Sequence, residues 1–287
     1  MNKTFLNNKD QLPLTCSRKG TCCHGNTVFL NPWEIAQLAQ EKEISTQQFI
    51  NDYTEDAGLR LKFNGKKDNR GKSSCNLYVD NFGCSVHKSR PLACRLFPIG
   101  RQIQNEEIKY IHQGEKFPCL NGCPEVIDLP KLSLENYLKG QATESYEIAQ
   151  DQYLEIVQNL ADIAFSLLLD TGLSASGETE TLTEWRKIGI ETPIQLSKRI
   201  NKEWHSLLLT PPIQEVNDPI QFTLQHNELL QEKAQSDFEK LSSLEEFKNA
   251  SIEIMAITLY LSKAIGADIK SLVAHWIEIA KENGAKE

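Results

Sequence analysis

The sequence contains no cysteine after Cys123, although eight cysteines occur in its 287 residues. No stretch approaches the roughly eighteen consecutive apolar residues that a membrane span requires. The first residues, MNKTFLNNKD, lack the basic and apolar regions of a secretion signal. These absences argue against an exported disulfide scaffold. They predict a soluble cytoplasmic protein that does not bind a membrane.

Positive charge is scarce and unevenly distributed. The chain has 31 Lys and Arg against 39 Asp and Glu, a formal net charge of −8. Residues 1–135 are mildly basic, whereas residues 136–287 are strongly acidic. Because affinity for phosphate backbones comes mainly from clustered Lys and Arg, such a chain is a poor nucleic-acid ligand. We therefore expect no nucleic-acid partner.

The length favours two domains, and the sequence pattern changes near residue 133. Residues 1–132 contain every cysteine, together with turn residues and short alternating stretches that predict hairpins at 75–87 and 101–113. Residues 133–287 have apolar side chains at three- and four-residue steps. The expected fold class is mainly α: a small, irregular α+β domain organised by metal and rich in cysteine, followed by an acidic α-helical bundle.

Capping residues locate several helix starts. Asn31, Pro32 and Glu34 predict one helix, and Ser45 is a suitable cap for a second. A long amphipathic helix is expected from about residue 143 to Gly172, and residues 244–266 are apolar enough for the central helix of a bundle. Further starts are predicted at Thr192, Asp218, Ser243 and Asp268. Packed or exposed positions without a functional role are expected for Trp185, Trp204, Trp276, His205, His226 and His275.

The cysteines are the candidate functional residues. They are Cys16, Cys22, Cys23, Cys75, Cys84, Cys94, Cys119 and Cys123. In a reducing compartment, clustered thiols more often bind metal or do redox chemistry than form disulfides. Four thiolates hold Zn²⁺ tetrahedrally or an iron–sulfur cluster, so eight sulfurs suffice for two sites, or for one site with spares. On an extended backbone, the adjacent Cys22 and Cys23 would point in different directions.

Two arginines flank Cys94 in the segment HKSRPLACRLFP. A zinc ion or iron cluster bound by four thiolates is anionic, and a nearby guanidinium lowers the cost of burying that charge. Arg90 and Arg95 are therefore predicted to contact the bound cofactor; the alternative is that they form surface ion pairs. His24 and His87 lie beside cysteines as potential nitrogen ligands, although the favoured interpretation is that neither binds metal.

Together the segments CSRKGTCC, CNLYVDNFGCSVHKSRPLACRLFP and CLNGC resemble the YkgJ-type cysteine-cluster family, over about residues 12–125. The resemblance implies a zinc- or iron-chelating domain with a CxxCxxCC signature. Some members of the family are similar to flagellin lysine N-methylases.

The signature is incomplete in this chain. Cys16, Cys22 and Cys23 fill its first, third and fourth places, but Lys19 stands in the second. Because a protonated lysine has no lone pair to give a metal, either this ligand is dispensable or another thiol replaces it. Cys123 is the candidate replacement.

Three functions follow from these patterns. The favoured one is a metal-binding module that holds an iron–sulfur cluster, of the 4Fe–4S type, or Zn²⁺, with the helical half recognising a protein partner. The resemblance implies an enzyme as the first alternative, an iron–sulfur-dependent protein lysine N-methylase with S-adenosylmethionine as donor. Its weakness is the lack of a glycine-rich nucleotide loop after a strand. The second alternative is a thiol redox sensor that uses Cys22 with Cys23, or Cys119 with Cys123.

Overall fold

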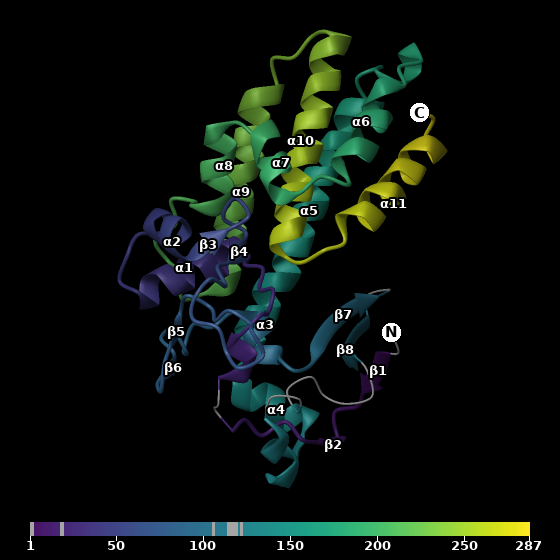
Figure 1. Cartoon of the computed structure of the whole chain (residues 1–287). Coiled ribbons are helices and arrows are strands. Elements are labelled where there is room, and N and C mark those ends of the chain that lie inside the picture. The colour runs from purple at the N-terminus through teal and green to yellow at the C-terminus, as the bar shows by residue number, and fades with distance from the viewer. Residues whose placement is uncertain (1–2, 18–19, 105–106, 114–119, 121–122) are drawn as a thin grey trace. The chain divides into compact units, whose positions relative to one another are not determined.

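A computed structural model of the whole chain describes residues 3–17, 20–104, 107–113, 120 and 123–287. The described residues form 11 α-helices, together with small β-sheets in the N-terminal region (Figure 1). The predicted fold class, mainly α with a small α+β N-terminal part, is confirmed.

The chain forms two compact units, and neither is a single continuous segment. The cysteine unit comprises Met1–Val28, Glu41–Glu43 and Leu61–Glu147, and the helical unit comprises Phe29–Gln40, Ile44–Arg60 and Ile148–Glu287. All described cysteines belong to the cysteine unit, and all four tryptophans belong to the helical unit. The domain boundary predicted between residues 132 and 133 stays a prediction.

Short elements make up most of the cysteine unit. They are β1 (Lys3–Leu6), β2 (Gln11–Leu12), η1 (Thr21–Cys23), β5 (Tyr78–Val79), β6 (Gly83–Cys84), α3 (Leu92–Leu96), β7 (Gly100–Gln104), β8 (Glu107–Gln113), η3 (Pro124–Asp128), β9 (Leu132–Ser133) and α4 (Leu134–Gln141). The largest sheet is antiparallel in the order β1–β8–β7, and β2 pairs with β9. The pairs β5–β6 and β7–β8 confirm both predicted hairpins, although the turn at Asn105 lies outside the described residues.

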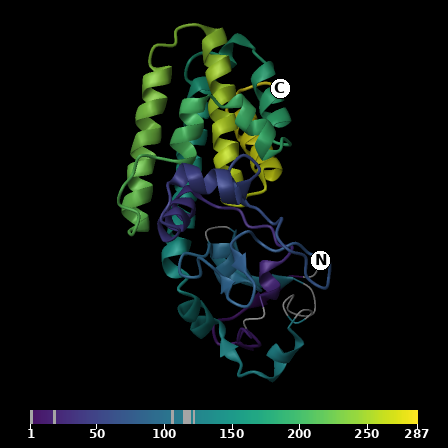
Figure 2. The ribbon, with the colours of Figure 1, turned by 60° about the vertical axis from the view of Figure 1, so that its left-hand side comes forward.

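Helices dominate the other unit. Its elements are α1 (Pro32–Glu41), α2 (Thr46–Tyr53), β3 (Thr54–Glu55), β4 (Arg60–Leu61), α5 (Glu144–Leu169), η4 (Ser174–Ser176), α6 (Glu180–Ile188), α7 (Pro193–Arg199), α8 (Lys202–Leu209), α9 (Pro219–Phe238), α10 (Leu244–Ala264) and α11 (Ile269–Glu282), with the ends of α1, α5 and β4 belonging to the cysteine unit. Helix α10 contacts α6, α7 and α11 and is buried along most of its second half (Figures 1 and 2). It is the central helix that its apolar composition predicts.

The predicted caps begin the helices as expected. Asn31 Oδ1 accepts from the Glu34 amide at 2.9 Å, and the Glu34 carboxylate accepts from the Asn31 amide at 3.1 Å, a reciprocal capping box. Ser45, Thr192, Asp218 and Ser243 cap α2, α7, α9 and α10 through their side chains, and α11 follows Asp268. Segment 29–40 thus contains most of the regular helix α1 and belongs to the helical unit, although cysteines lie on both sides of it in the sequence.

One helical stretch is more apolar than the sequence pattern predicted. Residues Glu144–Ser176 are long and apolar enough to cross a membrane by length and composition, with a mean hydropathy of 1.3 over their best window. The expectation that no stretch approaches a membrane span is therefore wrong for this helix. Of that window, 44% is buried inside the structure, and a core helix of a soluble protein meets the same criteria.

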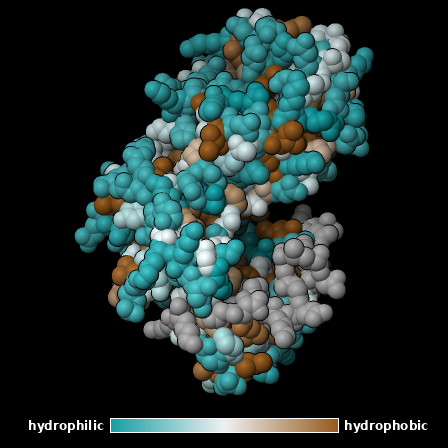
Figure 3. All heavy atoms as spheres, in the orientation of Figure 1, coloured by the Kyte–Doolittle hydropathy of each residue, from teal (hydrophilic) through white to brown (hydrophobic). Residues whose placement is uncertain are grey.

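The aromatic side chains of the helical unit are packed, as predicted. Trp185 and Trp204 have no exposed surface, and Trp276 is 3% exposed. His226 is fully buried, whereas His275 lies on an exposed face of α11. On the molecular face drawn in Figure 3, hydrophobic residues form small separate groups among hydrophilic ones.

Candidate metal centre

A tight turn places the first cysteines. Gly20 has a φ of 72°, in the left-handed region, and η1 follows it directly. A Cβ at this position would lie 2.6 Å from the Tyr78 ring, so only glycine allows Tyr78 to pack there. The same ring makes an edge contact with His24, with centroids 5.0 Å apart. The turn therefore fixes Cys22 and Cys23 beside the β5–β6 hairpin.

Backbone hydrogen bonds join three cysteine segments that are distant in sequence. The amide of Cys75 donates to the carbonyl of Cys23 at 2.8 Å. Within the hairpin, Tyr78 pairs with Cys84, and Asn81 makes the bend with a φ of 63°. The hydrogen-bonded chain thus brings Cys75 and Cys84 to the same region as η1.

Helix α3 contributes the next cysteine. Pro91 is its N-cap, and the amide of Cys94 donates to the Pro91 carbonyl at 2.9 Å. The pKa of Cys23 is raised mainly by its hydrogen bond to Cys22 and by burial, and the charges of Cys94 and Cys84 add to this, so Cys94 and Cys84 lie within electrostatic reach of Cys23. Burial raises the pKa of Cys84, and it raises the pKa of Cys75 to about 11.

The adjacent Cys22 and Cys23 do not behave as predicted. They lie on a 3₁₀ turn instead of an extended backbone, and their thiols contact each other. The Cys23 thiol donates to the Cys22 sulfur, which lowers the pKa of Cys22 to about 7. The same bond, together with burial, raises the pKa of Cys23. One thiolate is thus accessible near neutral pH, and any metal that takes both sulfurs must displace the second proton.

Arg90 faces these sulfurs. Its positive charge acts on Cys22, Cys84 and Cys94, and it lowers the pKa of Cys22. Burial and the nearby charge of Arg95 lower the pKa of Arg90 itself. The guanidinium is held in place because it donates to the His87 carbonyl at 2.7 Å and to the side chain of Gln141 at 2.5 Å. These contacts hold Arg90 within electrostatic reach of Cys84 and Cys94.

Arg95 is placed differently. It is 4% exposed, and its guanidinium donates to the carbonyls of Arg90 at 2.8 Å, of Gln141 at 2.6 Å, and of Lys88. Its charge lies 3.9 Å over the centroid of the Tyr146 ring. The surface ion-pair alternative is therefore wrong for Arg95, because this side chain is buried and joins the backbone of residues 88–90 to that of Gln141.

The remaining predicted ligands are distributed around this region. Cys123 is buried, and its sulfur lies 3.1 Å from Thr21 Oγ1, next to Cys22. Cys16 is exposed. Cys119 and Lys19 lie outside the described residues. His24 Nδ1 lies 3.0 Å from the Gly20 carbonyl, and His87 contacts Arg90.

The donor types fit a zinc or iron site, since soft thiolates select these metals. Cys22, Cys23, Cys75, Cys84 and Cys94 gather in one region, and a guanidinium lies beside them. Within the described residues, however, no three Cys, His, Asp or Glu side chains are close enough to hold one metal ion. A closed site therefore requires these side chains to move together, or a ligand from the undescribed positions.

Sequence reasoning missed several residues that shape this region. Gln141 binds both arginines, and Glu41 accepts from the Ser89 amide at 2.7 Å, which anchors the segment before α3. Neither has a recognisable sequence signal, because each acts across tens of residues. Gly20, directly before the TCC of η1, is the one missed position that a glycine beside a motif could have indicated.

Comparison with known proteins agrees with the resemblance. Residues 15–114 match the model of the CxxCxxCC family, whose description is "Putative zinc- or iron-chelating domain". The family predicted from the sequence is thereby confirmed for this segment, and with it metal binding of the zinc- or iron-chelating kind. The comparisons found no similar protein among curated proteins and no similar fold among solved structures.

Proposed function

We propose that the cysteine unit holds an iron–sulfur cluster through Cys22, Cys23, Cys84 and Cys94. The observation that carries this proposal is that these four thiols, from η1, β6 and α3, act electrostatically on one another and on Arg90, although among the described residues no three of them are yet close enough to hold one metal ion. Four thiolates are the usual ligand set of a four-iron cluster. Cys75 and Cys123 would then be spare thiols, since one four-iron cluster, like one tetrahedral zinc ion, takes four thiolates.

The arrangement of charge supports an anionic centre. The positive charge of Arg95 repels that of Arg90 and so disfavours the charged form of Arg90. Negative charge on the nearby sulfurs offsets this repulsion. A cluster held by four thiolates would supply that charge permanently. Arg90 would then tune the centre and limit the cost of burying it. In this proposal the protein is a cytoplasmic metal-binding module, and catalysis is not assigned to it.

Metal analysis of the anaerobically purified chain tests this function. We expect about four irons and about four sulfides per chain, with broad absorbance in the violet region. Cys84→Ser and Cys94→Ser should each lose most of this metal, while Ser85→Ala, beside Cys84, should retain it. One zinc ion per chain without sulfide would show that the unit holds a zinc site and would contradict the cluster. Unchanged metal content in both cysteine variants would contradict the ligand assignment.

A further inference from the structure

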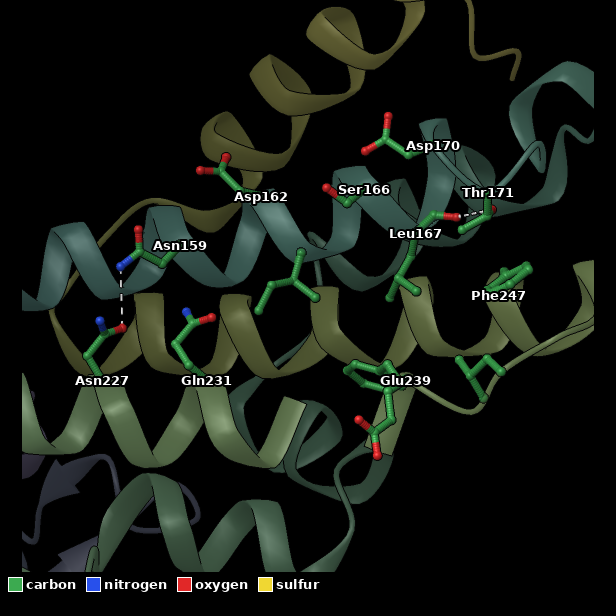
Figure 4. Close-up of a pocket in the computed structure, with 13 residues that line it drawn as sticks. Asn159, Asp162, Ser166, Leu167, Asp170, Thr171, Asn227, Gln231, Glu239 and Phe247 are labelled. Atoms are coloured by element: carbon green, nitrogen blue, oxygen red, sulfur yellow. Dashed lines mark hydrogen bonds between the residues drawn. The ribbon is translucent and has the colours of Figure 1, made fainter. Parts of the chain in front are cut away.

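The helical unit contains an open groove of about 730 Å³ that no cysteine lines. Figure 4 shows one edge, where Asp162 and Ser166 of α5 and Asp170, directly after α5, follow one another at four-residue steps. Helix α9 forms the other edge, and at one end Asn159 Nδ2 donates to Asn227 Oδ1 across the groove at 3.3 Å. The groove is therefore framed by two regular helices.

Five apolar side chains belong to the lining of the groove and are called its floor below. Ile163 and Leu167 come from α5, and Phe238, Leu241 and Phe247 come from the end of α9, the following turn and the start of α10. Leu167 is 8% exposed, and the other four are half-buried. A ligand that covers this floor removes apolar surface from water, which favours binding.

The charge of the lining is of one sign. It contains the carboxylates of Asp162, Asp170 and Glu239, and its described residues include no lysine or arginine. Asp162 does accept a hydrogen bond from Gln158 at 2.7 Å, but that neutral donor leaves the carboxylate charge in place. The groove thus combines an apolar floor with a negatively charged edge.

Two neighbouring lysines lie outside the lining. Lys240 is exposed and stands in sequence between the lining residues Glu239 and Leu241, and Lys233 is paired with carboxylates. A neighbouring hollow shares Phe238 and Leu241 with the groove and contains Lys233. The ammonium of Lys233 lies 2.7 Å from the carboxylate of Asp237 and 3.0 Å from that of Glu203. The charge of Lys233 is therefore offset by these two carboxylates, and the only charged side chains of the described lining are acidic.

The spacing of the carboxylates suggests the form of the ligand. Asp162 and Asp170 are eight residues apart, which is about 12 Å along a helix axis. A helical ligand lying along α5 presents cations at the same separation when they are seven or eight residues apart. Its apolar residues at three- and four-residue steps then lie on the floor, as in other helix-in-groove complexes.

We propose that this groove binds a basic amphipathic helical segment of a partner protein. The apolar face of the segment covers Ile163, Leu167 and Phe247, and its Lys or Arg side chains pair with Asp162 and Asp170. Because all these residues belong to the helical unit, the proposal does not depend on the metal centre.

The first test uses a defined probe on the full chain. A fluorescent peptide of about 18 residues carries leucines on one helical face and lysines seven or eight residues apart on its flank. A matched peptide has glutamate at each lysine position. Fluorescence anisotropy should show saturable binding of the lysine peptide alone, weakening as salt is raised. No binding of the lysine peptide, or equal binding of both peptides, overturns the proposal.

The second test locates the binding. Ser166→Arg places a cation between the two aspartates and should weaken binding at least about fivefold, whereas Ser236→Arg, on an exposed position of α9 outside the lining, should not. The double variant Asp162→Asn with Asp170→Asn should also weaken binding. The double variant Glu228→Gln with Glu232→Gln removes the same amount of charge from α9, outside the lining, and should not weaken it. Equal losses within either matched pair would show non-specific attraction and overturn the proposal.

Discussion

At the scale of single residues, Arg95 shows that a charged side chain in a cysteine motif can also hold the backbone in place. Its guanidinium donates to the carbonyls of Lys88, Arg90 and Gln141, and its predicted contact with a cofactor stays a prediction. The planar guanidinium of arginine has five N–H donors and can donate to three carbonyls that lie in different directions. The ammonium of lysine, on a flexible stem, cannot reproduce this set of hydrogen bonds. Arg95 therefore stabilises the path of the chain around Cys94.

We expect Arg95→Lys to lower the stability of the cysteine unit by about 2 kcal/mol, because buried carbonyls lose their donors. The measurement is the urea dependence of thiol labelling, since the described cysteines all lie in that unit. Arg70→Lys is the control: Arg70 is an exposed residue that pairs with Asp68 at 2.7 Å, and its replacement should change stability little. Equal effects of both variants would contradict the structural role of Arg95.

At the scale of elements, a buried polar chain joins three helices. His226 on α9 has Nε2 at 3.0 Å from the Leu207 carbonyl of α8 and Nδ1 at 2.9 Å from the Tyr153 hydroxyl of α5. A carbonyl only accepts, so Nε2 carries the proton and Nδ1 accepts from Tyr153. The neutral imidazole is thus satisfied on both sides, and burial lowers its pKa to about 4.

This pKa predicts a pH dependence of stability. Because the folded pKa lies below the unfolded value of about 6.5, the unfolded chain binds more protons between these values, and stability falls as pH drops from about 6.5 to 4. The loss from His226 amounts to about 3 kcal/mol at most. Urea unfolding followed by tryptophan fluorescence reports this unit, which contains every tryptophan.

Variants isolate the histidine from the many carboxylates that titrate in the same range. His226→Gln should be less stable at pH 8 yet lose less stability on acidification. His275→Gln, at an exposed position of α11, should keep the full dependence. An unchanged pH slope in His226→Gln would show that another group causes it.

At the scale of the whole molecule, local signals predicted more than long-range ones. The boxes at Asn31 with Glu34 and at Ser243 with Glu246 are short patterns with a direct physical cause, and the structure contains both. The contact of Cys22 with Cys23 was missed because it depends on a 3₁₀ turn that Gly20 and Tyr78 set together. The pairing of Arg90 with Gln141 spans 51 residues and has no local signature at all.

The difference between local and long-range signals also explains how much of the candidate site could be predicted. Which residues supply sulfur could be predicted, because thiolate chemistry and clustering are visible in the sequence. Which sulfurs meet could not, since this depends on the hydrogen bond between Cys75 and Cys23 and on the register that pairs Tyr78 with Cys84. Nor does a sequence indicate that segment 29–40, between two cysteine segments, belongs to the helical unit.

Metal removal should therefore affect the two units differently. The cysteine unit consists of short strands and turns with little regular structure, so metal–thiolate bonds supply a large share of its folding free energy. Treating the metal-loaded chain with a chelator should raise its thiol labelling rate by at least about tenfold and increase amide exchange around η1 and the β5–β6 hairpin. The tryptophan unfolding midpoint, which reports the helical unit, should change much less. Cys84→Ser, which lacks a proposed ligand, should respond little to the chelator. An equal change of both reporters in the wild-type chain would mean that the metal stabilises the helical unit as well.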